Sequence, residues 1–456
     1  MMLRTRVGLL GAVALLGGCG LTKDYHRPDL DVPGNFSGPA GDASQPSLAT
    51  LPWQQVYTDP ALQALIEEAL KNGPDGMLAE AQVRAAAAAA GIARAGQLPN
   101  VGLALQTSPT ARANDARLTS SFLGGVSASW EIDLWGRYAR ASEAARADFL
   151  ASRENFRAVT ALQIANVANL YYQLATLHGL ERVTQSVADT QEEGLRLIRE
   201  TSRAGINTAA DERQQESALA ATQANLPPLR QQVTQAENAL AVLLGRTPGS
   251  LQISMPVDLP LPASLPAGLP SALLERRPDI LAAEAQLHAA HARVGVAKAM
   301  FFPDISLTGF FGGVSTSLAD VLHGRAATVA SLGPNILQPL FAGGAIRFNY
   351  DAALAQLDQA LIVYRRTVNA ALGDVANNLN AYENSTDQVA IEARRVVAAR
   401  EALRLAELRF RSGVTTFLEL LDAQRQQLAS ESDSLNSQLL QRQALINAYL
   451  ALGGGT

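Results

Sequence analysis

The chain has 456 residues, of which 48% are hydrophobic, 17% are charged and only 5% are aromatic, and its formal net charge is −5. The mild negative charge and the wide separation of its lysines (Lys23, Lys71 and Lys298) argue against nucleic acid as a partner. Long alanine-rich stretches with little aromatic bulk favour closely packed long helices over a single globular core.

The first residues are predicted to be an export signal. Arg4 and Arg6 precede a run of apolar residues, 7–16, that is too short to span a bilayer as a mature helix. This run ends in Leu16-Gly17-Gly18-Cys19, which resembles the bacterial lipobox. Residues 1–18 are therefore predicted to be a lipoprotein signal peptide, and Cys19 the site of lipid attachment. An ordinary signal peptide with an incidental cysteine is the alternative.

The residues after the cleavage site indicate the membrane to which the protein is sent and an extended segment between the lipid and the folded body. Cys19 is the only cysteine, so no intrachain disulfide is possible. Gly20 stands where an aspartate retains lipoproteins at the inner membrane of enteric-type bacteria, and this rule predicts the outer membrane. Residues 19–52 are rich in Pro, Gly, Asp and Ser and lack sustained periodicity, which indicates an extended lipidated tether. The folded body is predicted to begin at Trp53.

The body contains one pattern twice, at a separation of 204 to 208 residues. Five short motifs recur in the same order. For example, Leu134-Trp135-Gly136 corresponds to Leu340-Phe341-Ala342, and Arg203-Ala204-Gly205-Ile206 corresponds to Arg411-Ser412-Gly413-Val414. A nearly constant offset indicates duplication. The predicted domains are a first repeat at 53–250, a Pro-rich linker at 251–270 and a second repeat at 271–456.

Each repeat is predicted to begin with a helix and two strands. Asp59-Pro60 and Arg277-Pro278-Asp279 each place a proline at the first helical position. Four segments with two-residue apolar alternation are predicted to be half-buried strands. These strands are 101–106, 126–131, 305–313 and 326–337. The polar segments between them, 109–120 and 314–325, are predicted to be exposed loops.

A very long helix, a glycine turn and a return helix complete each repeat. Residues 137–203 and 345–412 contain no proline, so each is predicted to form one helix on the order of 100 Å long. In the second of these, apolar residues repeat at spacings of three and four, as in a coiled coil. Pro227-Pro228 is predicted to kink or split the return helix of the first repeat.

Four strands per chain pose a physical problem in a membrane. Four strands cannot close a barrel, and an open sheet edge cannot lie in lipid. Several chains must therefore contribute to one barrel, and three chains would supply twelve strands. The predicted fold class is mainly α with a membrane β-barrel shared among chains, and the same symmetry would gather the helices into a second tube.

The segment from Leu269 to Gly309 resembles the TolC-like outer-membrane factor family, in its lipoprotein branch that serves resistance-nodulation-division (RND) efflux pumps. The motifs Glu275-Arg276-Arg277-Pro278-Asp279 and Phe302-Pro303-Asp304 carry this resemblance, which extends from Cys19 to Gly454. It implies a homotrimer with a 12-stranded β-barrel in outer-membrane lipid, a long periplasmic α-helical barrel and a mixed equatorial collar. It also implies a periplasmic adaptor (membrane fusion) protein, an inner-membrane RND-type pump and small-molecule export substrates.

The resemblance further implies which residues act. In the family, the turns after the long helices meet the adaptor. The matching residues here are Arg203, Gly205, Ile206, Arg411, Gly413 and Val414. Acidic residues at positions matching Asp211, Glu419 and Asp422 line the periplasmic aperture of the family. Because Thr415 and Phe410 stand where the family often has an arginine and a tyrosine, closure is expected to depend more on packing by Phe410 and Leu418. In the alternative interpretation the glycines only reverse the chain and the acids only favour helix N-termini.

Catalytic motifs are lacking from the sequence. It contains no P-loop and no Gly-x-Ser-x-Gly elbow, so we predict no enzyme activity and no cofactor. Glu284, His288 and His291 share one helix face and are the one candidate for a metal site, with plain packing in a helical bundle as the favoured alternative. Two other functions stay open: a lipid-anchored coiled-coil scaffold without a pore, which leaves the strands unexplained, and a duct for protein secretion, which the same fold would serve.

Overall fold

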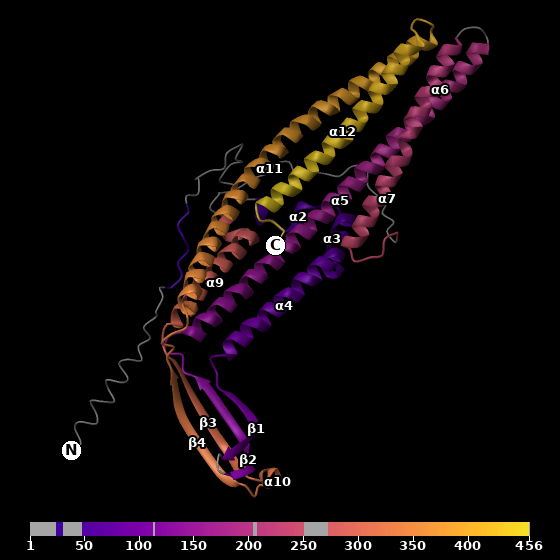
Figure 1. Ribbon diagram of the computed structural model, residues 1–456. Helices are drawn as coiled ribbons and strands as arrows, with labels where there is room; N and C mark the ends of the chain where they lie inside the picture. The colour runs from indigo at the N-terminus through magenta and orange to yellow at the C-terminus, as the bar shows by residue number, and fades with distance from the viewer. Residues whose placement is uncertain (1–23, 31–47, 113–114, 204–207, 250–271, 456) are drawn as a thin grey trace. The chain divides into compact units, whose positions relative to one another are not determined.

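The computed structural model describes residues 24–30, 48–112, 115–203, 208–249 and 272–455. Cys19, Gly205, Ile206 and the predicted linker lie outside these residues. Within these residues the chain is mainly helical and carries one four-stranded antiparallel sheet (Figure 1). Among the described residues, no helix combines the length and the apolar character needed to cross a bilayer.

Two compact units are built from interleaved parts of the chain. Unit 1 comprises Met1–Leu30, Gln82–Arg153 and Ala282–Arg366, and unit 2 comprises Asp31–Ala81, Glu154–Leu281 and Thr367–Thr456. Both units therefore draw on both halves of the sequence. The sheet belongs to unit 1, and unit 2 contains the return helices of both repeats with the C-terminal parts of the two long helices that precede them.

Matched helix lengths confirm the predicted duplication. Helices α4 (Pro74–Ala95) and α9 (Pro278–Ala299) both have 22 residues. Helices α5 (Arg137–Arg203) and α11 (Ala345–Arg411) both have 67 residues, as the absence of proline predicted. The counterpart of Pro278 is Pro74 and not Pro60, because a short helix α3 (Pro60–Asn72) precedes α4. The Asp59 side chain caps α3 by accepting a hydrogen bond from the Ala61 amide at 2.9 Å.

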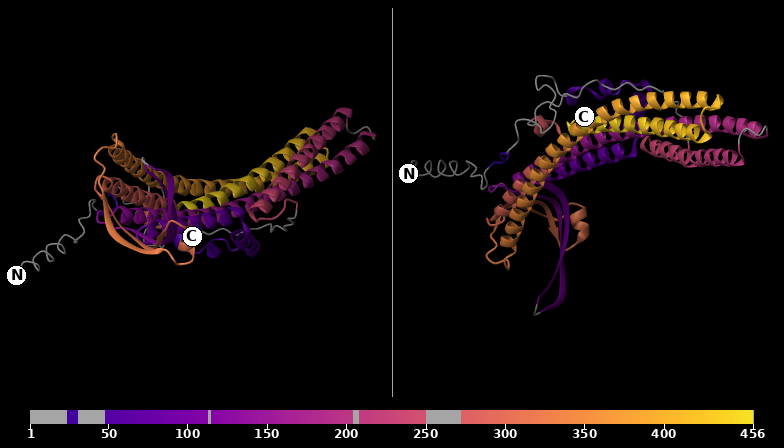
Figure 2. Two further views of the ribbon diagram at one scale, coloured as in Figure 1. Left: turned by 60° about the horizontal axis from the view of Figure 1, so that its bottom comes forward. Right: turned by 90° about the horizontal axis from the view of Figure 1, so that it is seen from above.

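The sheet has the order β1-β2-β3-β4. Figure 2 shows its purple strands from the first repeat and its orange strands from the second in two further views. Its strands are β1 (Asn100–Arg112), β2 (Asp115–Glu131), β3 (Asp304–Ser315) and β4 (Ala327–Leu337). The loop predicted at 109–120 is wrong, because Pro109 pairs with Ser120 and the ladder continues beyond them. The loop predicted at 314–325 is wrong at its start, where β3 continues to Ser315, and it contains the short helix α10 (Leu318–Leu322). The polar composition of these segments led to the loop prediction, whereas strand pairing depends on backbone groups.

Glycines bring two strands close together at the centre of the sheet. Gly125 of β2 faces Gly312 of β3 in register. A Cβ atom at Gly125 would lie 2.4 Å from the Phe311 carbonyl oxygen and 2.5 Å from the Gly312 Cα. Any larger residue at this position would push β2 away from β3.

Unit 2 buries its apolar residues along packed helices. Its N-terminal part contains η1 (Leu48–Thr50), α2 (Trp53–Val56) and α3. The return path of the first repeat is split into α6 (Ala209–Ala224) and α7 (Leu226–Leu243) next to the proline pair, as predicted. The second repeat continues through α8 (Leu273–Arg276) and ends in the unbroken α12 (Phe417–Ala451). The largest fully buried side chains of this unit include Tyr57, Leu62, Ile66, Tyr171, Leu174, Ile198, Leu240, Leu244 and Leu445.

Candidate functional site

Two helical hairpins of unit 2 contain most of the predicted site residues. One runs from α5 into α6 and the other from α11 into α12, and the starts of α6 and α12 lie at the same end of this unit (Figure 1). The first return helix begins with a capping box. The Thr208 amide and hydroxyl donate to Asp211 Oδ2 at 2.9 and 2.7 Å, and the Asp211 amide donates to Thr208 Oγ1 at 3.3 Å. Asp211 therefore stabilises the start of α6.

Gly413 ends the second long helix in a Schellman motif. Its φ of +70° lies in the left-handed region, where a Cβ atom would be strained. The Gly413 amide donates to the Phe410 carbonyl at 3.0 Å, and the Val414 amide donates to the Arg409 carbonyl at 2.9 Å. These bonds satisfy carbonyls at the helix end, as the glycine turn predicted. Arg411 and Val414 are exposed on either side of this glycine.

Glu419 is held by partners from both sides of this turn. Arg409 Nη1 lies 2.9 Å from Glu419 Oε1, and the Thr415 hydroxyl donates to Glu419 Oε2. The two charged side chains are about half exposed. The sequence did not single out Arg409, although a basic residue in the last turn of a helix is a common partner for an acid across a short turn. The resemblance aligned Thr415 with an arginine of the family; in this structure Arg409 supplies a guanidinium from the preceding helix.

The remaining aperture candidates differ in exposure. Asp422 is exposed and accepts a hydrogen bond from Gln426 Nε2 at 2.7 Å. Leu418 is 61% exposed. Phe410 instead packs edge-on against Phe417, with ring centroids 5.9 Å apart, and joins the buried apolar cluster between the hairpins. Leu418 is therefore free to contact other surfaces, whereas Phe410 contributes to the core of its own chain.

A cavity of about 430 Å³ lies between the two hairpins. Phe410, Phe417 and Leu420 contribute apolar walls, and Gln215 and Gln424 contribute polar ones. These two glutamines are 0% and 4% exposed, and their Oε1 atoms accept no hydrogen bond within the described part of the chain. Acidic residues at the cavity are Asp189, Glu193 and Glu407, beside Arg411.

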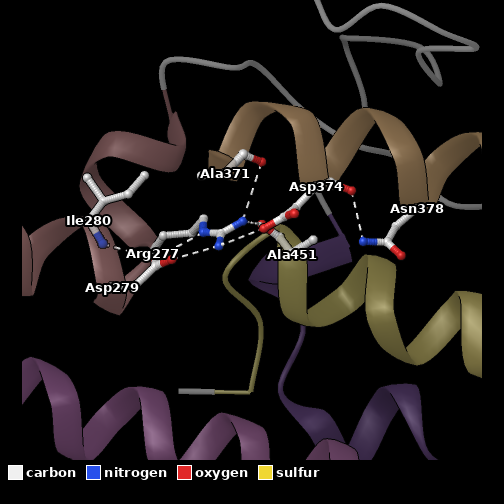
Figure 3. Close-up of polar contacts among 7 residues, drawn as sticks. All are labelled: Arg277, Asp279, Ile280, Ala371, Asp374, Asn378 and Ala451. Carbon is white, nitrogen blue, oxygen red and sulfur yellow. Dashed lines mark hydrogen bonds and ion pairs between the residues drawn. The ribbon is translucent and has the colours of Figure 1, made fainter. Parts of the chain in front are cut away.

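A second polar centre in unit 2 is built around Arg277, from the motif that carried the family resemblance (Figure 3). Its guanidinium forms a bidentate ion pair with Asp279, with N to O distances of 3.0 and 2.7 Å. Nη1 donates to the backbone carbonyls of Ala451 and Ala371 at 3.1 and 3.4 Å, and Nη2 lies 3.4 Å from Asp374 Oδ2. The Arg277 side chain is only 11% exposed. One residue thus joins the start of α9, the end of α12 and the middle of α11.

The metal candidates on α9 each contact another partner in unit 1. Glu284 pairs with Arg27, and His288 Nε2 lies 2.8 Å from Glu143 Oε1. Burial opposes ionisation of Glu143, but hydrogen bonds from His288 and Arg140 hold its pKa below the usual range. The part of the chain that the structure describes contains no group of three or more His, Cys, Asp or Glu side chains that could hold a metal ion.

Comparison with known proteins places this geometry in a family. The profile of the family described as "Outer membrane efflux protein" matches residues 65–246 and 269–454. The solvent efflux pump outer membrane protein SrpC of Pseudomonas putida is 34% identical, over 97% of each chain. The pyoverdine export outer membrane protein OpmQ of Pseudomonas aeruginosa is 33% identical, over 98% of this chain and 96% of the relative. The solved MtrE outer membrane channel of Neisseria gonorrhoeae, in its open state, superposes with a TM-score of 0.86 at 32% identity, over 96% of this chain and 98% of that one.

Proposed function

The chain belongs to the outer membrane efflux protein family, and on this premise we propose that it is the passive outer-membrane duct of a tripartite efflux pump, active as a homotrimer. In this proposal a periplasmic adaptor and an inner-membrane RND-type pump complete the assembly. The duct itself supplies no energy and catalyses no reaction.

The observation that supports a shared barrel is the open sheet. Strands β1 and β4 each pair on one side only within the described residues, so each has an edge of unpaired backbone groups. Such an edge is costly in lipid and must be closed by another strand. Apolar residues at alternate positions of β1 are exposed, with Val101 at 65%, Leu103 at 89% and Leu105 at 60%. This pattern suits a lipid-facing surface, and pairing of β4 with β1 of the next chain would close twelve strands in a trimer.

The mass of the purified protein tests this proposal. In mild detergent, size-exclusion chromatography with light scattering should give the mass of three chains, and the same fraction should conduct ions in planar bilayers. A stable monomer or dimer that conducts would contradict a barrel shared among three chains.

Small molecules are the proposed cargo. The relatives above are named for export of solvents and of pyoverdine, and their similarity covers nearly the whole chain. This favours small-molecule export over protein secretion, and the open sheet disfavours a scaffold without a pore. A strain that lacks this chain should retain more of its pump's substrate, and the cloned chain should restore efflux. Unchanged retention with an intact pump and adaptor would refute the assignment.

The ends of the hairpins are proposed to face the periplasm. Arg203, Gly205, Ile206, Arg411, Gly413 and Val414 are the proposed adaptor contacts. Val414 is 69% exposed, which suits a contact with another protein. Glu419 and Asp422 are proposed to line the aperture, where threefold symmetry would bring the carboxylates together. Cys19 is proposed to carry the lipid that anchors the N-terminus.

A further inference from the structure

A short N-terminal segment of unit 1, residues 24–30, packs on the parts of α5 and α9 that also belong to unit 1. It has no regular secondary structure, yet it makes ion pairs and ring contacts with α5 and α9. The duct function described above does not use these contacts. They involve His288 and His291, which the sequence suggested as candidates for a metal site.

Ion pairs fix this segment to both helices. Arg27 binds Glu284 of α9 in a bidentate manner, with Nε to Oε1 at 2.7 Å and Nη2 to Oε2 at 2.5 Å. The Glu284 side chain is only 16% exposed, so losing Arg27 would leave a mostly buried carboxylate without this partner. Asp24 lies 3.2 Å from Arg140 of α5. A planar guanidinium that binds a carboxylate in a bidentate manner fixes the relative orientation of the two groups as well as the distance between them.

Ring contacts lie between these two ion pairs. The Tyr25 ring stacks on His288, with centroids 4.6 Å apart and an angle of 15° between the planes. The same ring meets His291 edge-on at 5.9 Å. The hydroxyl of Tyr25 is buried without a hydrogen bond in the described structure, and so is Nδ1 of His291. The contact therefore depends on the ring of Tyr25 and not on its hydroxyl.

Chain length makes this contact relevant to the membrane anchor. From Cys19 to Asp24 there are five residue steps, which span at most about 18 Å. If the segment were released, the next described residue of the chain would be Leu48 of unit 2, 29 steps from Cys19, and the maximum span from that residue would be about 100 Å. Docking of residues 24–30 thus limits how far the lipid can lie from the parts of α5 and α9 that this segment contacts.

We propose that Asp24, Tyr25 and Arg27 form a clasp that holds the segment behind the lipid anchor on α5 and α9, and that acid opens this clasp. The link to the anchor rests on the proposed acylation of Cys19. The docking itself does not depend on acylation.

The direction of the acid effect follows from the surroundings of His291. Burial lowers the pKa of His291, and Arg140 and His288 act in the same direction, while Glu143 and Asp24 oppose them. The Tyr25 ring lies against the imidazole ring of His291 in a T-shaped contact. When the segment leaves, His291 regains water and its pKa rises toward the ordinary value. The open form therefore binds a proton more tightly, so docking is complete above about pH 6.5 and weakens as the pH falls below that value.

A spin label on the segment tests the clasp in the purified full-length trimer. His26 is exposed and takes no part in the contacts described above, so His26→Cys offers a labelling site. An acylated Cys19 has no free thiol, and the protein should then carry one label per chain. Two labels per chain would show that acylation has failed, whatever the clasp does.

The expected spectra distinguish docking from a free segment. At neutral pH the label should move slowly, and Tyr25→Ala or Arg27→Ala should speed its motion on the order of tenfold. Tyr25→Phe keeps the aromatic ring, so the label should move as slowly in this variant as in the native protein. Arg246→Ala removes an equally bidentate pair with Glu68 in unit 2 and should also leave the label slow.

Titration tests the acid response. Lowering the pH to about 5 should speed the label in the native protein, and His291→Gln should remove this response while the trimer still elutes at its native volume. Fast motion in the native protein at neutral pH would overturn the clasp, as would a slow label in Tyr25→Ala. An acid response that persists in His291→Gln would overturn the assignment to this residue.

Discussion

Replacing Arg277 with alanine should loosen the end of α12 far more than loss of an ordinary surface ion pair. The guanidinium is 11% exposed and binds Asp279 in a bidentate manner. It also donates to the carbonyl of Ala451, one of the last carbonyls of α12, which has no partner within its own helix. The alanine variant therefore loses a helix cap and a charge pair together.

The magnitude follows from burial. A hydrogen bond to a charged group contributes about 1.5–3 kcal/mol, and a buried acceptor left without a partner costs about 1–3 kcal/mol. Asp279 and Asp374 are 42% and 54% exposed, so water replaces much of their interaction with Arg277. The expected loss is about 2–3 kcal/mol, most of it at the Ala451 carbonyl, because the Ala371 carbonyl lies inside α11 and keeps its partner in that helix. Arg246→Ala provides the control, because that side chain is 41% exposed and its pair with Glu68 is expected to contribute about 1 kcal/mol or less.

Hydrogen exchange at the end of α12 measures this difference. Amides near Leu452 should exchange about 30- to 150-fold faster in Arg277→Ala, because each 1.4 kcal/mol corresponds to a factor of ten. Arg277→Lys keeps the positive charge but lacks the planar guanidinium that binds in a bidentate manner. Its exchange rates should therefore lie between those of the alanine variant and those of the native protein. If Arg277→Ala and Arg246→Ala gave the same exchange rates at these amides, the cap at Ala451 would contribute nothing and the reasoning would be refuted.

Three further predictions concern the turns and the anchor. Gly413→Ala should destabilise the protein by about 1–2 kcal/mol in thermal unfolding, because φ is positive there, whereas Gly373→Ala within α11 should be neutral or stabilising by up to about 1 kcal/mol; equal effects would contradict this. Thr208→Ala removes the capping box with Asp211 and should cost about 1 kcal/mol, with faster exchange confined to the start of α6. Cys19→Ser should abolish N-terminal acylation in mass spectra while the barrel keeps some transport; an acylated terminus in this variant would contradict the proposed attachment site.

Local patterns predicted the long elements well because their signals repeat along the chain. The absence of proline over 67 residues was enough to predict α5 and α11. The proline pair predicted the break before α7, and Gly413 predicted the end of α11. Each of these features depends on the conformation of a few neighbouring residues.

Local sequence patterns could not predict contacts between residues that are far apart in the sequence. The bond between Arg277 and Ala451 joins residues 174 positions apart, and no local periodicity reports it. The histidines of α9 suggested a metal site, but Tyr25, more than 250 residues earlier, covers them. The loop predicted at 109–120 failed for a related reason, because strand pairing satisfies backbone groups whatever the polarity of the side chains.

Neighbouring charges also decide which acid can attract ions at the proposed aperture. Glu419 lies 2.9 Å from Arg409, so this pair is nearly neutral beyond a Debye length of about 8 Å. Asp422 is exposed and its described partner is the uncharged Gln426. Asp422→Asn together with Glu419→Gln should therefore lower cation preference and cation block in planar bilayers, with trimer assembly intact.

Separate variants assign the effect to one of these carboxylates. Asp422→Asn alone removes a net negative charge and should lower cation preference. Arg409→Gln combined with Glu419→Gln removes one charge of each sign and should leave cation preference nearly unchanged. If the double variant lowered cation preference as much as Asp422→Asn does, the charges of Arg409 and Glu419 would not cancel each other in the channel. If neither set changed it, these carboxylates would serve only the helix N-terminus, and the constriction would lie elsewhere.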